Sequence, residues 1–139
     1  MKSPHRTVLA LAAALAVAAV AQADTLERQM ENLARFEKHA GAPIDSFFYP
    51  RLYQWQALGK EAVAVWSGVN KVYLLKVAKP CINLDWAKTI GVTASGGTVK
   101  TRFDYVTFDH QRCQIASIQP VDYAAVRAEM STQKAEKDR

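Results

Sequence analysis

After Pro43 the chain consists of short β-favouring segments separated by turn residues, and this pattern constrains the fold more than any other feature. Aromatic and β-branched residues, which favour strands, are concentrated in these segments. Segments joined by tight turns are typical of an antiparallel meander. The predicted strands are Ser46–Tyr49, Leu52–Leu58, Ala62–Trp66, Lys71–Ala78, Ile90–Ala94, Thr98–Phe108 and Arg112–Ile118.

Three polar or glycine-containing segments mark the predicted turns. Ser67–Asn70 is expected to join the third strand to the fourth, and Ser95–Gly97 the fifth to the sixth. Asp109–Gln111 is expected to form a third turn before the last strand.

Two of the strands differ in how their side chains alternate. Lys71–Ala78 is apolar on both faces, which predicts a central strand covered on each side, with the N-terminal helix as one cover. Thr98–Tyr105 alternates instead, which predicts one buried and one solvated face. Its predicted buried face carries Val99, Thr101, Phe103 and Tyr105, and its solvated face carries Lys100, Arg102 and Asp104.

Helical patterns precede and follow the strands. Residues 25–40 place Leu26, Met30 and Leu33 on one face and end before Gly41 and Pro43. Near the C-terminus, Pro120–Asp122 is expected to end the sheet, and a short helix is expected from Tyr123 to about Met130, capped by Asp122. The sequence therefore predicts an α+β fold: six to seven antiparallel strands, as an open sheet or a small barrel, with a helix at each end.

The first 23 residues have the pattern of a secretory signal peptide. Lys2, His5 and Arg6 precede an apolar run from Val8 to Ala21, and Ala21-Gln22-Ala23 is a small-x-small cleavage site. The apolar run is shorter than the about twenty residues that span a bilayer. We therefore predict cleavage before Asp24, a periplasmic or secreted protein, and no transmembrane segment after cleavage.

The remaining chain fits one domain. Residues 24–131 are predicted to form a single α+β domain, and residues 132–139 a charged flexible tail. Lys2 and Arg6 lie in the predicted leader, which leaves sixteen basic against thirteen acidic residues and a net charge of +3. This excess is small and scattered, so a nucleic-acid partner is not indicated.

The two cysteines, Cys81 and Cys113, predict one disulfide. An even number of cysteines in an oxidising compartment usually pairs, and two cysteines allow only one intramolecular pairing. Closing a loop of this length stabilises a chain by roughly 3–4 kcal/mol.

Candidate ligand-binding residues are aromatic or basic. Tyr53 and Trp55 share a face of their predicted strand, where they either pack in a core or form a surface for a flat ligand such as a sugar. Lys100 and Arg102, on the solvated face of theirs, either remain solvated or contact an anion.

Evidence for catalysis is weak. The sequence has no glycine-rich phosphate loop, no G-x-S-x-G and no H-E-x-x-H. A free Cys113 with His110 as its base is one enzymatic hypothesis. His39 and His110, with Asp85, Asp104 or Asp109, lack the spacing of a compact zinc site. We therefore predict no metal, no cofactor and no catalytic residue.

Several motifs in the second half of the chain resemble a known family. They are Cys81-Ile82-Asn83-Leu84-Asp85, Ile90-Gly91-Val92-Thr93, Phe103-Asp104, Cys113-Gln114-Ile115 and Ile118-Gln119-Pro120-Val121-Asp122. Together they resemble domain-of-unknown-function family 6491, a family of small secreted proteobacterial proteins, over roughly Trp55 to Asp122. The resemblance implies an envelope location and a Cys81–Cys113 pair, and it implies no activity.

These observations lead to three functional hypotheses. The favoured one is a non-enzymatic module that binds an envelope component or a protein partner through an exposed sheet face or edge. The alternative is an inhibitor of a secreted hydrolase that uses the three turns named above. The third is an enzyme that uses Cys113 and His110.

Overall fold

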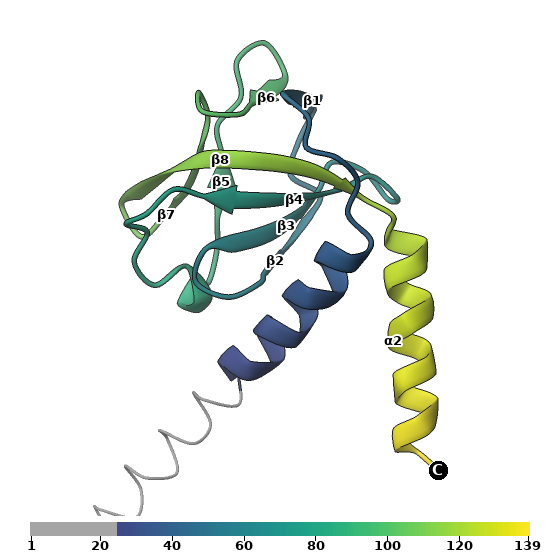
Figure 1. The fold of residues 1–139 in the computed structure, drawn as a ribbon. Coiled ribbons are helices and arrows are strands. Elements are labelled where there is room, and N and C mark those ends of the chain that lie inside the picture. Colours follow the sequence, from purple (N-terminus) through teal and green to yellow (C-terminus); the bar gives the residue numbers. More distant parts are fainter. Residues whose placement is uncertain (1–24) are drawn as a thin grey trace, which may run out of the picture.

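The computed structural model describes residues 25–139, and the predicted signal peptide lies outside these residues. The described chain begins with a helix over residues 25–38 and ends with helix α2, and eight strands lie between them (Figure 1). The elements after the first helix are β1 (Ser46–Phe48), β2 (Gln54–Ala57), β3 (Ala62–Trp66), β4 (Val72–Val77), the 3-10 helix η1 (Leu84–Trp86), β5 (Gly91–Val92), β6 (Thr98–Lys100), β7 (Tyr105–Phe108), β8 (Gln111–Val121) and α2 (Tyr123–Lys137).

The strands form two antiparallel sheets. The larger sheet has the order β2-β3-β4-β8-β7-β5 and is curled into half a barrel, and β1 pairs with β6 in a separate two-stranded ribbon. β2, β3 and β4 form a meander, after which β8 inserts between β4 and β7. The predicted α+β class, antiparallel pairing and single disulfide are confirmed.

β8 connects most of the fold. One of its edges pairs with β4, from Val121 opposite Val72 to Ile115 opposite Val77. β7 pairs with the first residues of β8. Further along, Ala40 and Ile44 form bridges with Val121 and Ile118.

The curled sheet encloses one hydrophobic core, which we call the inner core. Alternation along β3 directs Val63 and Val65 into it, and Leu75 of β4 packs beside them with no exposed surface. Its buried members are Phe47, Tyr49, Val63, Val65, Leu75, Val77, Leu84, Ile90, Val99, Val106, Phe108, Cys113, Ile115 and Ile118.

The opposite face of the sheet packs against both helices and forms the outer core. Phe36 of the first helix, Trp66 of β3 and Tyr123 of α2 make edge-on or tilted ring contacts there, with centroids 5.1–6.2 Å apart. The buried members of the outer core are Phe36, Leu58, Ala62, Ala64, Trp66, Val72, Leu74, Val121 and Val126. The predicted role of the first helix as a cover for the central strand is thereby confirmed.

The single strand predicted over Thr98–Phe108 is wrong. The chain forms β6, turns over residues 101–104, and then forms β7. The alternation changes at this turn, so that Phe103 is 60% exposed and Asp104 is 3% exposed, the reverse of the prediction. The Ser95–Gly97 turn is present, but β5 and β6, which flank it, belong to different sheets.

The C-terminal end of the sheet and the last helix are both longer than predicted. β8 continues through Pro120 to Val121. The Pro120 carbonyl accepts the Gly41 N–H at 2.7 Å, so the backbone polar groups of Pro120 face Gly41 and not β4. The N–H that proline lacks therefore removes no hydrogen bond between β8 and β4. α2 extends to Lys137 rather than ending near Met130, through residues with good helix propensity and lysines in the last turn. Asp122 caps it as predicted, accepting a hydrogen bond from the Ala125 N–H at 3.2 Å.

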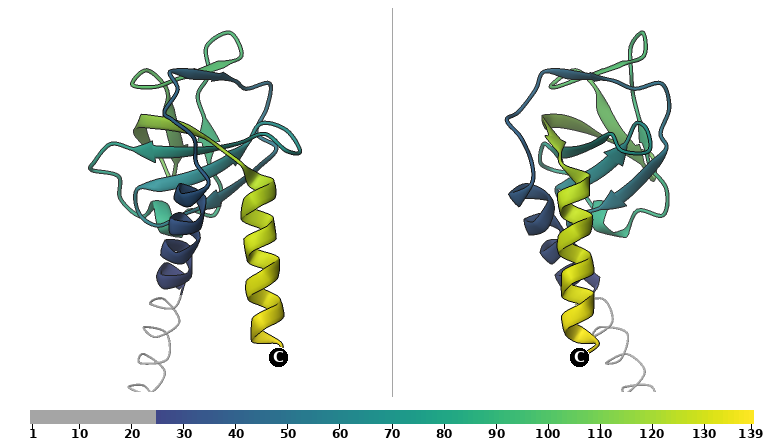
Figure 2. Two further views of the ribbon diagram at one scale, coloured as in Figure 1. Left: turned by 45° about the vertical axis from the view of Figure 1, so that its right-hand side comes forward. Right: turned by 90° about the vertical axis from the view of Figure 1, so that its right-hand side faces the viewer.

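Neither helix within residues 25–139 combines the length and the apolar character needed to cross a membrane. The two helices project from the same side of the sheet, and the β1–β6 ribbon lies at the opposite end of the molecule (Figures 1 and 2).

Candidate binding groove

The turn between β6 and β7 is held by the buried carboxylate of Asp104. One Asp104 oxygen accepts a hydrogen bond from the Lys100 N–H at 2.7 Å, and the other accepts one from the Thr93 hydroxyl at 2.7 Å. The Asp104 N–H in turn donates to the Lys100 carbonyl at 3.0 Å. Arg102, within the turn, has a φ of +64°, a left-handed conformation that the surrounding bonds maintain.

This turn faces the segment that leads into β1, and a groove lies between them. The Thr101 N–H donates to the Asp45 carbonyl at 2.9 Å, and its hydroxyl donates to the Ile44 carbonyl at 3.2 Å, which ties the two walls together. β8 forms the floor. The groove has a volume of about 720 Å³ and is lined by Pro43, Ile44, Asp45, Ser46, Lys100, Thr101, Arg102, Phe103, Ala116, Ser117 and Ile118.

An irregularity in β8 explains why the groove exists. The pairing with β4 shifts register so that Lys76 is opposite Ser117 while Val77 is opposite Ile115. On the other edge of β8, the Ile115 carbonyl accepts the Arg102 N–H of the turn, whereas the Ile118 carbonyl accepts the Ile44 N–H. The two partner segments therefore diverge between Ile115 and Ile118, and this divergence opens the groove.

The groove combines an exposed aromatic ring, Phe103, with two basic side chains. The Lys100 ammonium lies 5.9 Å from the centre of the Phe103 ring, a cation–π arrangement. Within residues 25–139, neither Lys100 nor Arg102 forms an ion pair with a carboxylate. Asp45 is the acidic residue of the lining. The arrangement suits a ligand that presents an anionic group together with an apolar part.

Of the four residues singled out from the sequence, the groove contains two. Lys100 and Arg102 both line it. Tyr53 lies outside this lining, 53% exposed beneath the guanidinium of Arg51 at 5.7 Å. Trp55 pairs with Val65 in the neighbouring strand and packs against the inner core.

Sequence reasoning missed Thr101, Phe103 and Asp104 as parts of the site. Treating the segment as one continuous strand assigned Phe103 and Asp104 to the wrong faces and did not place Thr101 in a turn. An aspartate four residues after Lys100 was the available signal, because a short acidic side chain often closes a turn by accepting a nearby backbone N–H.

The hypothesis of a free catalytic cysteine is not compatible with the structure. Cys81 and Cys113 form a disulfide, with Cα atoms 5.7 Å apart, and no free cysteine remains among the described residues. His110 is an exposed turn residue with a φ of +62°. Residues 25–139 contain no cluster of three or more His, Cys, Asp or Glu side chains arranged to hold a metal.

A second group of charged residues lies between the two helices, around Glu129 of α2. The Glu129 carboxylate is 2.8 Å from His39 Nε2, 3.5 Å from Lys38 Nζ and 3.9 Å from Arg35 Nε. Arg35 also donates to the Gln133 side chain. The hydrogen bond with His39 and the charge of Lys38 lower the pKa of the Glu129 carboxyl, against a smaller opposing effect of burial.

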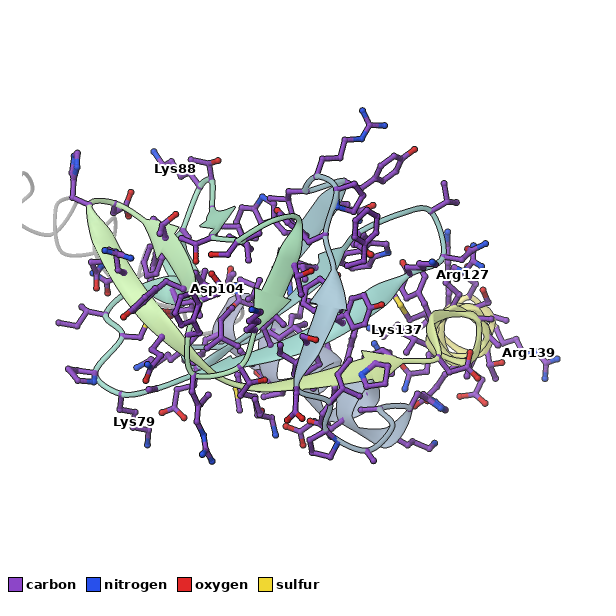
Figure 3. All side chains as sticks on the ribbon, turned by 90° about the horizontal axis from the view of Figure 1, so that it is seen from above. Lys79, Lys88, Asp104, Arg127, Lys137 and Arg139 are labelled. Carbon is purple, nitrogen blue, oxygen red and sulfur yellow. A yellow bond between two sulfur atoms is a disulfide. The ribbon has the colours of Figure 1, made fainter. Side chains whose placement is uncertain are left out.

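The groove and this helical region are separate parts of the molecule. Seen from above, Asp104 lies over the sheet, whereas Arg127, Lys137 and Arg139 surround α2 at the side (Figure 3). Within residues 25–139 the basic residues of the groove have no carboxylate partner, whereas those between the helices share Glu129. The groove is therefore the better candidate for an external anion.

Comparison with known proteins identifies the family of the chain. No curated protein and no solved structure matches it. The profile of a family of unknown function, DUF6491, matches residues 3–137. The match covers nearly the whole chain, including both cysteines and every residue of the groove, and the chain therefore belongs to the family of unknown function DUF6491.

Proposed function

We propose that this protein is a non-enzymatic binding module of the cell envelope, and that its groove recognises an anionic group of an envelope component. The observation that carries the proposal is the pair of basic side chains at the end of β6 and in the turn after it, Lys100 and Arg102, which have no carboxylate partner within residues 25–139. Phosphate and carboxylate are the anionic groups that a guanidinium and an ammonium recognise.

The rigidity of the turn favours binding. The Asp104 carboxylate accepts the Lys100 N–H at 2.7 Å, and the Arg102 carbonyl accepts a hydrogen bond from Gln114 Nε2 at 2.7 Å. A preorganised backbone loses little conformational entropy when a ligand binds.

Two features support an envelope location. The first 23 residues have the composition of a secretory leader. The Cys81–Cys113 disulfide is typical of proteins in oxidising compartments.

Two of the three turns named in the hydrolase-inhibitor hypothesis lie far apart. The Asp109–Gln111 turn includes the first residue of β8. The Ser67–Asn70 turn lies near the other end of β8, because it precedes Val72, which pairs with the last β8 residue, Val121. These turns are roughly 30 Å apart at the usual rise of a strand. They do not form one continuous edge, so inhibition stays a prediction that this geometry does not favour.

Calorimetric titration with glycerol phosphate, and with uncharged glycerol as the control ligand, tests the proposal. We expect glycerol phosphate to bind and glycerol not to bind. The double variant Lys100→Gln/Arg102→Gln should weaken binding at least about tenfold, because charged hydrogen bonds are lost. The matched variant Lys71→Gln/Lys88→Gln, at exposed lysines outside the groove, should stay within about twofold of the unchanged protein. Equal affinity in the two double variants would refute the groove as the site.

A further inference from the structure

The outer surface of the β1–β6 ribbon carries Phe48 and Lys100, and the turn after β6 carries Phe103 beside the Lys100 ammonium. Pairing of Phe47 with Val99 places both side chains in the inner core, where they are 4% and 0% exposed. Alternation along each strand then directs Phe48 and Lys100 to the outside. Phe48 is 67% exposed, and Phe103 on the following turn is 60% exposed.

Each ring has a neighbour on the same part of the fold. Phe48 lies over the backbone of Gly97, where a Cβ atom would be 3.5 Å from the Phe48 ring and where φ is +77°. Phe103 lies under the Lys100 ammonium. Exposed apolar rings next to basic groups are typical of a surface that contacts an apolar partner with an anionic rim.

The position of this surface leaves it open to a flat partner. The ribbon lies at the end of the molecule opposite the projecting helices (Figures 1 and 2), so neither helix obstructs an approach from this end. The neighbouring turn, residues 94–96, exposes only small uncharged side chains. Of the two acidic residues nearby, Asp104 is buried and accepts two internal hydrogen bonds, whereas Asp45 is exposed and lines the groove.

We infer that this end of the molecule docks on an anionic phospholipid surface. Phe48 and Phe103 enter the boundary between headgroups and acyl chains, while Lys100 and Arg102 contact headgroup phosphates. We call these four residues the lipid-facing set. The inference rests on the proposed function and narrows it, since it assigns the anionic group to a lipid bilayer rather than to a free molecule.

Vesicle co-sedimentation tests the inference. The purified chain is mixed with vesicles of phosphatidylcholine alone, or of phosphatidylcholine with about 30% phosphatidylglycerol, which supplies anionic headgroups. All variants carry the same N-terminal segment, so a lipid affinity of that segment is common to every measurement. We expect stronger partitioning into the anionic vesicles, and we expect Lys100→Gln/Arg102→Gln to lower that partitioning roughly 30-fold, about fivefold for each basic residue.

The phenylalanines separate docking on a bilayer from binding of a soluble anion. Phe48→Ser/Phe103→Ser should lower partitioning at least about tenfold, because both rings lose apolar contact with the lipid. Phe48→Ser alone, at a residue outside the groove lining, should still lower partitioning, and it should leave the affinity for soluble glycerol phosphate within about twofold, the usual range for an exposed side chain outside the site. The matched control Val69→Ser/Ile82→Ser removes side chains that are 67% and 62% exposed outside the groove lining, and it should partition like the unchanged protein.

The outcomes distinguish the two proposals. If Phe48→Ser/Phe103→Ser partitions like the control variant, the lipid inference is wrong, and the binding of glycerol phosphate still decides the proposed function. If Lys100→Gln/Arg102→Gln keeps its affinity for glycerol phosphate, the proposed function fails as well. Partitioning that is equal for neutral and anionic vesicles would also overturn the inference. A variant Phe48→Trp gives an independent readout, since brominated lipid should quench the added fluorescence beyond the quenching of the native tryptophans.

Discussion

The inner and outer cores are built from the same sheet but support different parts of the molecule. Val99 and Ile118 of the inner core lie next to or within the groove, and Ile115 accepts the N–H of Arg102. None of the outer-core residues lines the groove. The outer core instead attaches the two helices, with Val126 as the buried residue of α2.

This division indicates that binding and helix attachment can be changed independently. A change in the outer core should alter the stability of the protein without altering the groove. A change within residues 100–104 should alter both the stability and the binding of the anion. The variants below test that separation, beginning with the largest expected loss of stability.

Phe36→Ala should lower the free energy of unfolding by about 3–5 kcal/mol, because a fully buried ring is removed from the outer core. Urea denaturation measures the loss. The control Met30→Ala, at a side chain that is 49% exposed on the same helix, should cost much less. The affinity of folded Phe36→Ala for glycerol phosphate should be unchanged, and a parallel loss of affinity would show that the two cores are not separable.

Cys81→Ala/Cys113→Ala should lower the free energy of unfolding by roughly 3–4 kcal/mol, since the unfolded chain regains the entropy of an open loop of 32 residues. Denaturation with and without reductant provides the internal control: reductant should destabilise the unchanged protein and leave the double variant unaffected. A response of the double variant to reductant would contradict this explanation.

Asp104→Asn should lower the free energy of unfolding by about 1–3 kcal/mol. The substitution replaces one of two buried acceptor oxygens by an NH₂ group, which then faces a donor, either the Thr93 hydroxyl or the Lys100 N–H. It should also weaken glycerol phosphate binding, since Lys100 and Arg102 lose their fixed backbone. Asp109→Asn, at an exposed turn residue, is the control and should change neither quantity appreciably. Full binding by Asp104→Asn would show that the turn needs no buried carboxylate.

Asp122→Ala should cost about 1 kcal/mol, the usual value of an N-cap, through loss of the bond to the Ala125 N–H. Hydrogen exchange of the first amides of α2 measures the effect and should accelerate there alone. Asp138→Ala, at the other end of α2, is the matched control. Faster exchange throughout the sheet would contradict a local role for this cap.

Lowering the pH should weaken the attachment of α2 through Glu129, the smallest of these effects. Because the folded-state pKa of Glu129 is lowered, its contribution is present above the unfolded-state pKa and is lost as the pH falls through the folded value. Stability curves between about pH 7 and pH 3 should be flatter for Glu129→Gln than for the unchanged protein. The control Glu136→Gln should keep the original slope, and identical slopes for both variants would argue against the Glu129 contacts.

Much of the fold followed from local patterns. The first helix, the β3–β4 hairpin and the cap at Asp122 were predictable, because apolar periodicity and turn residues act over a few positions. The β1–β6 pairing was not predictable, since it joins strands about fifty residues apart through a register that no local signal specifies.

The candidate site was predictable only in part. Lys100 and Arg102 could be selected as solvated cations, but the groove depends on a turn that interrupts their strand and on the irregularity of β8. Tyr53 and Trp55 were selected as aromatic residues that share a face of one predicted strand, and tertiary packing places them outside the groove, with Trp55 against the inner core. Burial of Asp104 depends on Thr93, which precedes β6 and contacts the turn only in the folded chain.

The most direct test of the proposed anion site is a map of amide chemical-shift changes in the unchanged protein during titration with glycerol phosphate. The proposal predicts saturable changes at Ser46, at residues 100–103 and at Ser117, and none with glycerol. Saturable changes centred instead on Arg35 and Lys38, the basic residues near Glu129, would contradict it, as would the absence of saturable change.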